Sequence, residues 1–152
     1  MAAADSYRHV RSLASLSLAL EMMQCEMCSS LRPLPEMCRE IAARVPFPAD
    51  RLMREIADMS DQIGERRFSD IWTEAVRSTP ELQLKPDESA VLVELGAGLG
   101  RYGLEEEESR LRGYAARIAA AWERAETEHR TNVRLYLSGG AAAGAVMALL
   151  LI

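Results

Sequence analysis

Aromatic residues are scarce in this sequence, at 5% of its 152 residues. Glycine and proline are also sparse, with nine and six residues. Strands are enriched in aromatic and β-branched residues, whereas the alanine, leucine, glutamate, arginine and methionine that dominate here favour helix. The composition therefore predicts an all-α protein, and a chain of this length forms one domain with its own core.

An excess of basic charge is also missing. The formal net charge is -5 at pH 7 and the pI is near 5.2. Proteins that bind nucleic acid depend on a strong positive potential to neutralise phosphates. Nucleic acid is therefore excluded as an expected partner.

Cysteines are too few for a disulfide framework. Cys25, Cys28 and Cys38 are an odd number and lie in or beside helical patterns, which is typical of reduced thiols. The Cys25-x-x-Cys28 pair has no second such pair and no spaced histidines to complete a zinc site. His9 and His129 are far apart in sequence and are expected at the surface. We predict no metal, no cofactor and no small-molecule substrate.

Apolar residues recur at steps of three and four, and prolines and glycines separate them into about six helices. The first is long and amphipathic from Leu13 onward. The others are expected at residues 34–44, from 48 to 63, around 68–76, at 86–99 and from 105 onward. The expected fold is a compact bundle, with a short polar tail at 1–6 and a helical domain at 7–134.

Residues 135–152 contain no charged side chain. As a helix they span about 27 Å, close to the minimum for a bilayer core. A buried C-terminal helix is the alternative, but a short bundle cannot easily cover a helix that is apolar all round. The sequence thus predicts that the last helix continues into a transmembrane anchor, in which Gly140 and Gly144 have the spacing of a helix-pairing motif.

Basic residues precede this anchor and none follows it. Arg117, Arg124, Arg130 and Arg134 lie on its N-terminal side, so the positive-inside rule places the helical domain in the cytoplasm.

The glycine-rich segment around residues 91–103 has two interpretations. As a strand followed by a loop, Glu94–Gly100 resembles the cofactor-binding opening of a methyltransferase. That fold needs a second strand ending in an acidic residue, and only helical pattern follows. The favoured interpretation is the end of one helix and the turn into the next, with Leu95 and Leu99 packed in the bundle and small residues allowing the two helices to approach closely.

Three segments then resemble the stage III sporulation protein AB family over nearly the whole chain. The first is the helix start Pro33-Leu34-Pro35-Glu36. The second is the lone tryptophan of a helix, Trp72. The third is the repeated Leu-Gly pattern, whose matching residues are Leu95, Gly96, Leu99, Gly100 and Arg101. Gly103 and Glu107 depart from the aspartate and glutamine of the family pattern, and the family's N-terminal transmembrane helix is not found at Met1–Asp5.

The resemblance implies a non-enzymatic role. It implies a helical cytoplasmic domain similar to that of the type II secretion inner-membrane platform protein, located at the mother-cell membrane that surrounds the forespore. The partners would be the membrane and the other proteins of the channel between mother cell and forespore, including a secretion-type ATPase.

Four arginines are candidates for a basic rim close to the membrane: Arg8, Arg11, Arg130 and Arg134. Two other functions remain open from the sequence. One is an enzyme that binds a nucleoside cofactor at Glu94–Gly100, and the other is a tail-anchored adaptor unrelated to sporulation.

Overall fold

Prolines lie near several of the helix boundaries of this protein, as the sequence predicts. The computed structural model describes the backbone of residues 2–29, 33–62, 66–99 and 104–151, and the side chains of residues 6–27, 33–61, 66–99 and 106–131. Its elements are α1 (Ala2–Ser29), α2 (Leu34–Ala42), α3 (Ala49–Gln62), α4 (Phe68–Ser78), the 3-10 helix η1 (Pro80–Leu82), α5 (Pro86–Gly98) and α6 (Leu104–Leu151). No strand occurs in these residues, so the all-α prediction is confirmed.

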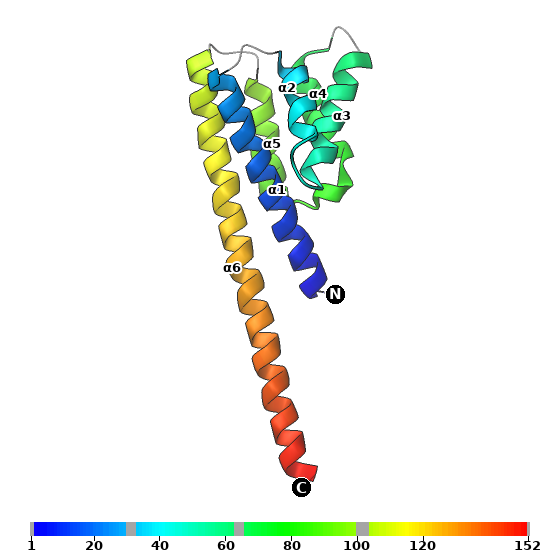
Figure 1. Ribbon diagram of the computed structural model, residues 1–152, viewed down its shortest axis with the longest axis vertical. Coiled ribbons are helices and arrows are strands. Elements are labelled where there is room, and N and C mark those ends of the chain that lie inside the picture. The colour runs from blue at the N-terminus through cyan, green and yellow to red at the C-terminus, as the bar shows by residue number, and fades with distance from the viewer. Residues whose placement is uncertain (1, 30–32, 63–65, 100–103, 152) are drawn as a thin grey trace.

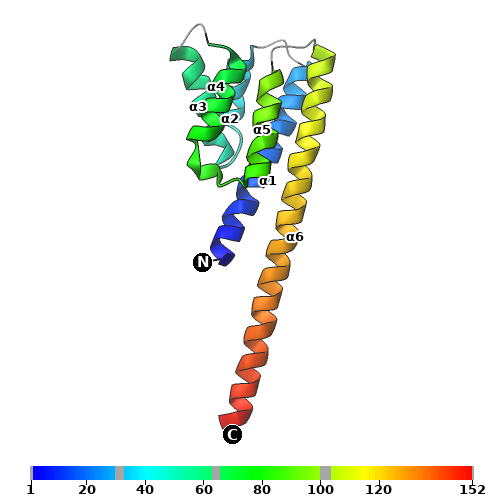
Figure 2. The same ribbon diagram turned by 180° about the vertical axis from the view of Figure 1, so that it is seen from behind.

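The helices alternate in direction from one to the next (Figure 1). α1 and α6 lie side by side and antiparallel, and α5 packs against α6 as well. α2, α3 and α4 form the other side of the bundle, with α4 against α5 (Figure 2). The N-terminus, the α2–α3 connection and η1 therefore lie toward the end of the bundle from which α6 protrudes; we call this the tail end.

The main core of the bundle consists largely of leucine, methionine and isoleucine side chains. Leu16, Leu20, Met23, Leu52 and Ile56 are completely buried, and α5 and α6 add Leu92, Leu95 and Leu111. A smaller cluster joins Leu13 of α1 to Ala121 and Ala125 of α6. Alanines on α6 let the backbones of these two long helices come close.

The start of the first helix differs from the sequence prediction, whereas the length of the last helix agrees with it. α1 begins at Ala2, so the expected polar tail at 1–6 is helical from its second residue. α6 is a single helix of 48 residues, which continues well beyond the bundle (Figure 1).

The predicted transmembrane anchor is not supported by the structure. Within the part of the chain that the structure describes, no helix is both long enough and apolar enough to cross a membrane. The backbone of α6 is helical through the predicted anchor as far as Leu151. The side chains of residues 132–152, including those of Arg134 and the anchor, lie outside the described residues, as do any helix-pairing contacts of Gly140 and Gly144.

Candidate functional site

The Leu-Gly pattern belongs to a packing contact between α4 and α5. Trp72 of α4 is fully buried, and its indole Nε1–H donates a hydrogen bond to the main-chain oxygen of Leu92, 2.8 Å away. Its ring lies directly on Gly96, where an added Cβ would overlap Cδ1 and Cγ of the indole. Gly96 is therefore the residue that makes room for the tryptophan.

This contact corrects in part the prediction that the small residues let the fifth and sixth helices approach closely. Of the two described glycines in this segment, Gly96 faces Trp72 of α4, whereas Gly98 lies against the guanidinium of Arg110 on α6. Leu95 and Leu99 are buried, as expected. α5 ends at Gly98, and the Leu99 N–H bonds to the Gly96 oxygen at 3.1 Å. Gly100, Arg101 and Gly103 lie outside the described residues.

The cofactor-binding interpretation of Glu94–Gly100 requires a strand at Val91–Leu95. These residues instead lie within the helix α5. Glu94 is exposed, and its carboxylate pairs with Arg117 of α6 at 3.8 Å. The backbone geometry that would present a glycine loop to a nucleoside cofactor is therefore missing from the described part of this segment.

The predicted helix start at Pro33 opens α2. Pro33 occupies the cap position with an extended backbone, φ -58° and ψ 146°, and its oxygen accepts the Met37 N–H at 3.1 Å. Leu34 begins the helix, Pro35 lies in its first turn, and Glu36 is exposed there. A carboxylate in the first turn is favourable beside unpaired main-chain N–H groups.

A buried polar contact between α1 and α5 was missed by the sequence analysis. His9 was expected at the surface, yet its side chain is only 15% exposed and that of Glu88 only 7%. His9 Nε2 lies 2.6 Å from Glu88 Oε1, which also accepts the Lys85 N–H at 3.0 Å. In the sequence Glu88 is recognisable only as an acidic residue in the first turn of a helix. The residues around it do not indicate that its partner is His9, 79 residues away.

A second contact joins α1 to η1. The hydroxyl of Ser12 is buried and donates to the main-chain oxygen of Leu82 at 2.5 Å. Ser15, one turn later, accepts the Ala49 N–H at 3.3 Å. These two serines attach the first residue of α3 and the 3-10 helix before α5 to the first half of α1, and so stabilise the tail end of the bundle.

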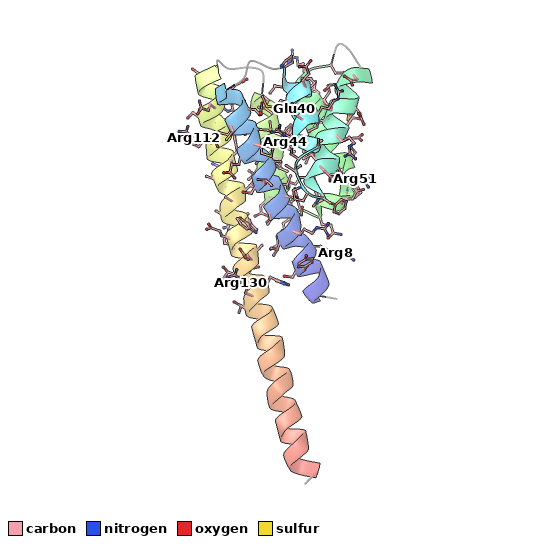
Figure 3. All side chains as sticks on the ribbon, in the orientation of Figure 1. Arg8, Glu40, Arg44, Arg51, Arg112 and Arg130 are labelled. Carbon is pink, nitrogen blue, oxygen red and sulfur yellow. The ribbon has the colours of Figure 1, made fainter. Side chains whose placement is uncertain are left out.

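Three of the four arginines of the predicted basic rim lie toward the tail end. Arg8 and Arg11 are on α1, and Arg130 is on α6 where that helix leaves the bundle (Figure 3). His129 Nδ1 lies 3.0 Å from the Ser6 hydroxyl, which places this part of α6 beside the start of α1. Arg130 pairs with Glu126 at 2.7 Å.

The cysteines do not form a metal site in the described part of the chain, which contains no cluster of three or more histidine, cysteine or acidic side chains. Cys25 is exposed and Cys38 is buried. Burial raises the pKa of the Cys38 thiol to about 12, because a thiolate loses its hydration there. Cys38 is thus a small apolar core residue at neutral pH, and the side chain of Cys28 lies outside the described residues.

Comparison with known proteins points to one family. A solved structure titled "Stage III sporulation protein AB" superposes with a TM-score of 0.74, at 22% identity, over 81% of this chain and 97% of that chain. At this identity the likeness shows the fold. None of the curated proteins matches. The family model of stage III sporulation protein AB matches residues 1–152, so the chain belongs to the stage III sporulation protein AB family.

Proposed function

We propose that this protein is a non-enzymatic, membrane-anchored assembly component of the channel between the mother cell and the forespore. Membership of the family relates the chain to sporulation. The observation that carries the rest is α6, which starts inside the bundle and continues as one helix through the charge-free residues 135–151. The same helix thus contributes to the core and forms the segment that would enter the membrane.

The domain would lie on the cytoplasmic side of the mother-cell membrane around the forespore. Basic residues precede the charge-free segment and none follows it, which favours a cytoplasmic domain by the positive-inside rule. Antiparallel packing of α1 on α6 puts the first turns of α1 toward the tail end (Figure 1), and an anchor at the end of α6 would bring them close to that membrane.

A platform role fits the polar surface and the rigid joining of the helices. Exposed ion pairs cover the outside of the bundle, among them Arg39–Asp61, Arg66–Glu74 and Arg112–Glu108. Charged surfaces of this kind give specificity to protein contacts. We propose a secretion-type ATPase and the other channel proteins as partners, similar to the arrangement around a type II secretion platform protein.

Membrane fractionation tests the anchor. The full chain is expected to sediment with membranes and to float with phosphatidylcholine vesicles after reconstitution, and a chain lacking residues 135–152 is expected in the soluble fraction. A milder variant is Val146→Arg, which puts a charge in the middle of the segment at a cost of about 3 kcal/mol for insertion.

Thr131→Arg is the matched control, because Thr131 is exposed on α6 before the segment begins. It should leave membrane association unchanged. A full chain that stays wholly soluble would contradict the proposal. Co-purification from detergent with the channel proteins tests the partners, and recovery of none of them would leave an anchored protein without the platform role.

A further inference from the structure

Phe47 lies between two arginines toward the tail end of the bundle. Phe47 is 37% exposed, and the guanidinium carbons of Arg11 and Arg51 lie 5.1 Å and 6.0 Å from the centroid of its ring. Arg8 lines the same hollow, together with Pro48, Glu81 and Gln83. We call Arg8, Arg11, Phe47 and Arg51 the arginine–phenylalanine patch.

The guanidinium groups of this patch have no carboxylate within ion-pair distance among the residues that the structure describes. Many other arginines do have one: Arg39, Arg54, Arg66, Arg112, Arg117 and Arg130. Asp50, next to Arg51, is directed to Arg54 at 4.0 Å instead. Glu81 is the one acidic residue that lines the hollow, so the patch keeps a net positive charge in a chain whose net charge is -5.

The side chains of the patch are suited to a phosphate group. Lys85 is the only lysine in the chain, and the other 17 of the 18 basic residues are arginine. Guanidinium groups form paired hydrogen bonds to phosphate oxygens, and they are more weakly hydrated than an ammonium group. The ring of Phe47 holds two of these groups by cation–π contact, so less side-chain freedom is lost when an anion binds.

The location of the patch favours a phosphate group that belongs to a membrane lipid. Arg8 lies on the stretch of α1 that extends toward the protruding part of α6, and Arg51 lies at the start of α3 (Figure 3). Tyr7, the neighbour of Arg8 in the sequence, is 57% exposed, and its ring lies 6.2 Å from that of His129 on α6. Aromatic and basic side chains together are typical of surfaces that meet the headgroup layer of a membrane.

We propose that the arginine–phenylalanine patch binds the headgroups of anionic phospholipids and so tilts the bundle toward the membrane on the α1 side. This inference rests on the proposed membrane anchor and adds a second point of attachment to it. It also reassigns the predicted basic rim. Arg8 and Arg11 belong to the lipid contact with Arg51, whereas Arg130 is paired within its own helix.

Lipid titration of the full chain in neutral detergent micelles tests this inference. Phosphatidylglycerol and phosphatidylcholine are added separately, and the shift of the thermal midpoint gives an apparent affinity. Phosphatidylglycerol is expected to bind more tightly, with an advantage that shrinks as salt is added. Arg8→Gln, Arg11→Gln and Arg51→Gln should each weaken its binding about fivefold, since a basic residue near an anionic surface is worth about 1 kcal/mol.

The matched control is Arg112→Gln, which makes the same charge change near the opposite end of the bundle (Figure 3). It should leave the affinity for phosphatidylglycerol unchanged. Phe47→Leu keeps an apolar side chain but removes the ring, and should weaken binding of phosphatidylglycerol only. Circular dichroism of each variant verifies that it is folded.

Three results would overturn the inference. The first is equal affinity for the two lipids, and the second is an Arg112→Gln variant as weak as Arg51→Gln. The third is complete displacement of the lipid by equimolar glycerol phosphate or by an acidic peptide, which would assign the patch to a free anion or to a protein. Failure of the anchor itself is distinguishable, because the full chain would then not float with phosphatidylcholine vesicles.

Discussion

At the scale of single residues, Trp72 and Gly96 determine each other. The indole occupies the space in which any other residue at position 96 would have its Cβ. The indole N–H donates to the main-chain oxygen of Leu92, which lies one turn before Gly96 on α5. A buried indole without that acceptor would be costly, because its N–H would lose water and gain nothing. Trp72 and Gly96, which both belong to the segments that resemble the family, therefore form one packing contact.

Gly96→Ala is expected to destabilise the protein by about 1–3 kcal/mol, because the new methyl group forces the indole to move within a close-packed core. Gly113→Ala makes the same change on α6, where a Cβ meets nothing within 4 Å. It should instead stabilise by about 0.5–1 kcal/mol, since alanine is the better helix former. Chemical denaturation followed by circular dichroism measures both, and a Gly96→Ala chain as stable as the original would disprove the contact.

Glu88→Ala removes the partner of His9 and the acceptor of the Lys85 N–H. Both groups are then left without that acceptor at a mostly buried site, and the expected loss of stability is about 1–3 kcal/mol. Glu94→Ala is the control, because the pair of Glu94 with Arg117 is exposed, and such pairs contribute little in water. Equal losses for the two variants, measured in the same denaturation experiment, would argue against a structural role for the His9–Glu88 contact.

At the scale of helices, the sequence predicts the elements much better than their pairing. Prolines at positions 33, 35, 46, 48, 80 and 86 lie near the starts and ends of helices, and the helix expected around residues 68–76 is α4 (Phe68–Ser78). Apolar periodicity shows which face of a helix is buried, but not which helix covers it. The contacts of Trp72 with α5 and of His9 with Glu88 could not be predicted, because each depends on the packing of distant helices.

The α1–α6 interface depends on small residues. Ala121→Leu should destabilise by about 1–3 kcal/mol, because Ala121 is buried against Leu13 of α1 and a larger side chain would push the helices apart. Ala116→Leu places the same side chain at an exposed position of α6 and should change stability by less than about 0.5 kcal/mol. The comparison of unfolding midpoints tests whether α1 and α6 pack as closely in solution.

At the scale of the whole molecule, one helix connects the bundle to the tail, without a linker between them. α6 runs from Leu104 to Leu151 without an interruption. The loss of charge predicts a domain boundary at residue 134 within a continuous last helix, and the backbone of α6 is helical across that position. Composition predicts where the surroundings of a helix change, and it does not indicate whether the helix bends or stops.

Because α6 is continuous, it fixes the rotation about its own axis between a partner bound to the tail and a partner bound to the bundle. Each residue of an α-helix turns the chain by about 100°. One alanine inserted after Thr131 should therefore turn the tail to another side of the bundle while leaving both parts folded. Seven inserted residues restore the phase to within about 20°, so sporulation should fail with one inserted residue and recover with seven. A tail that acts only as a tether would tolerate both insertions equally.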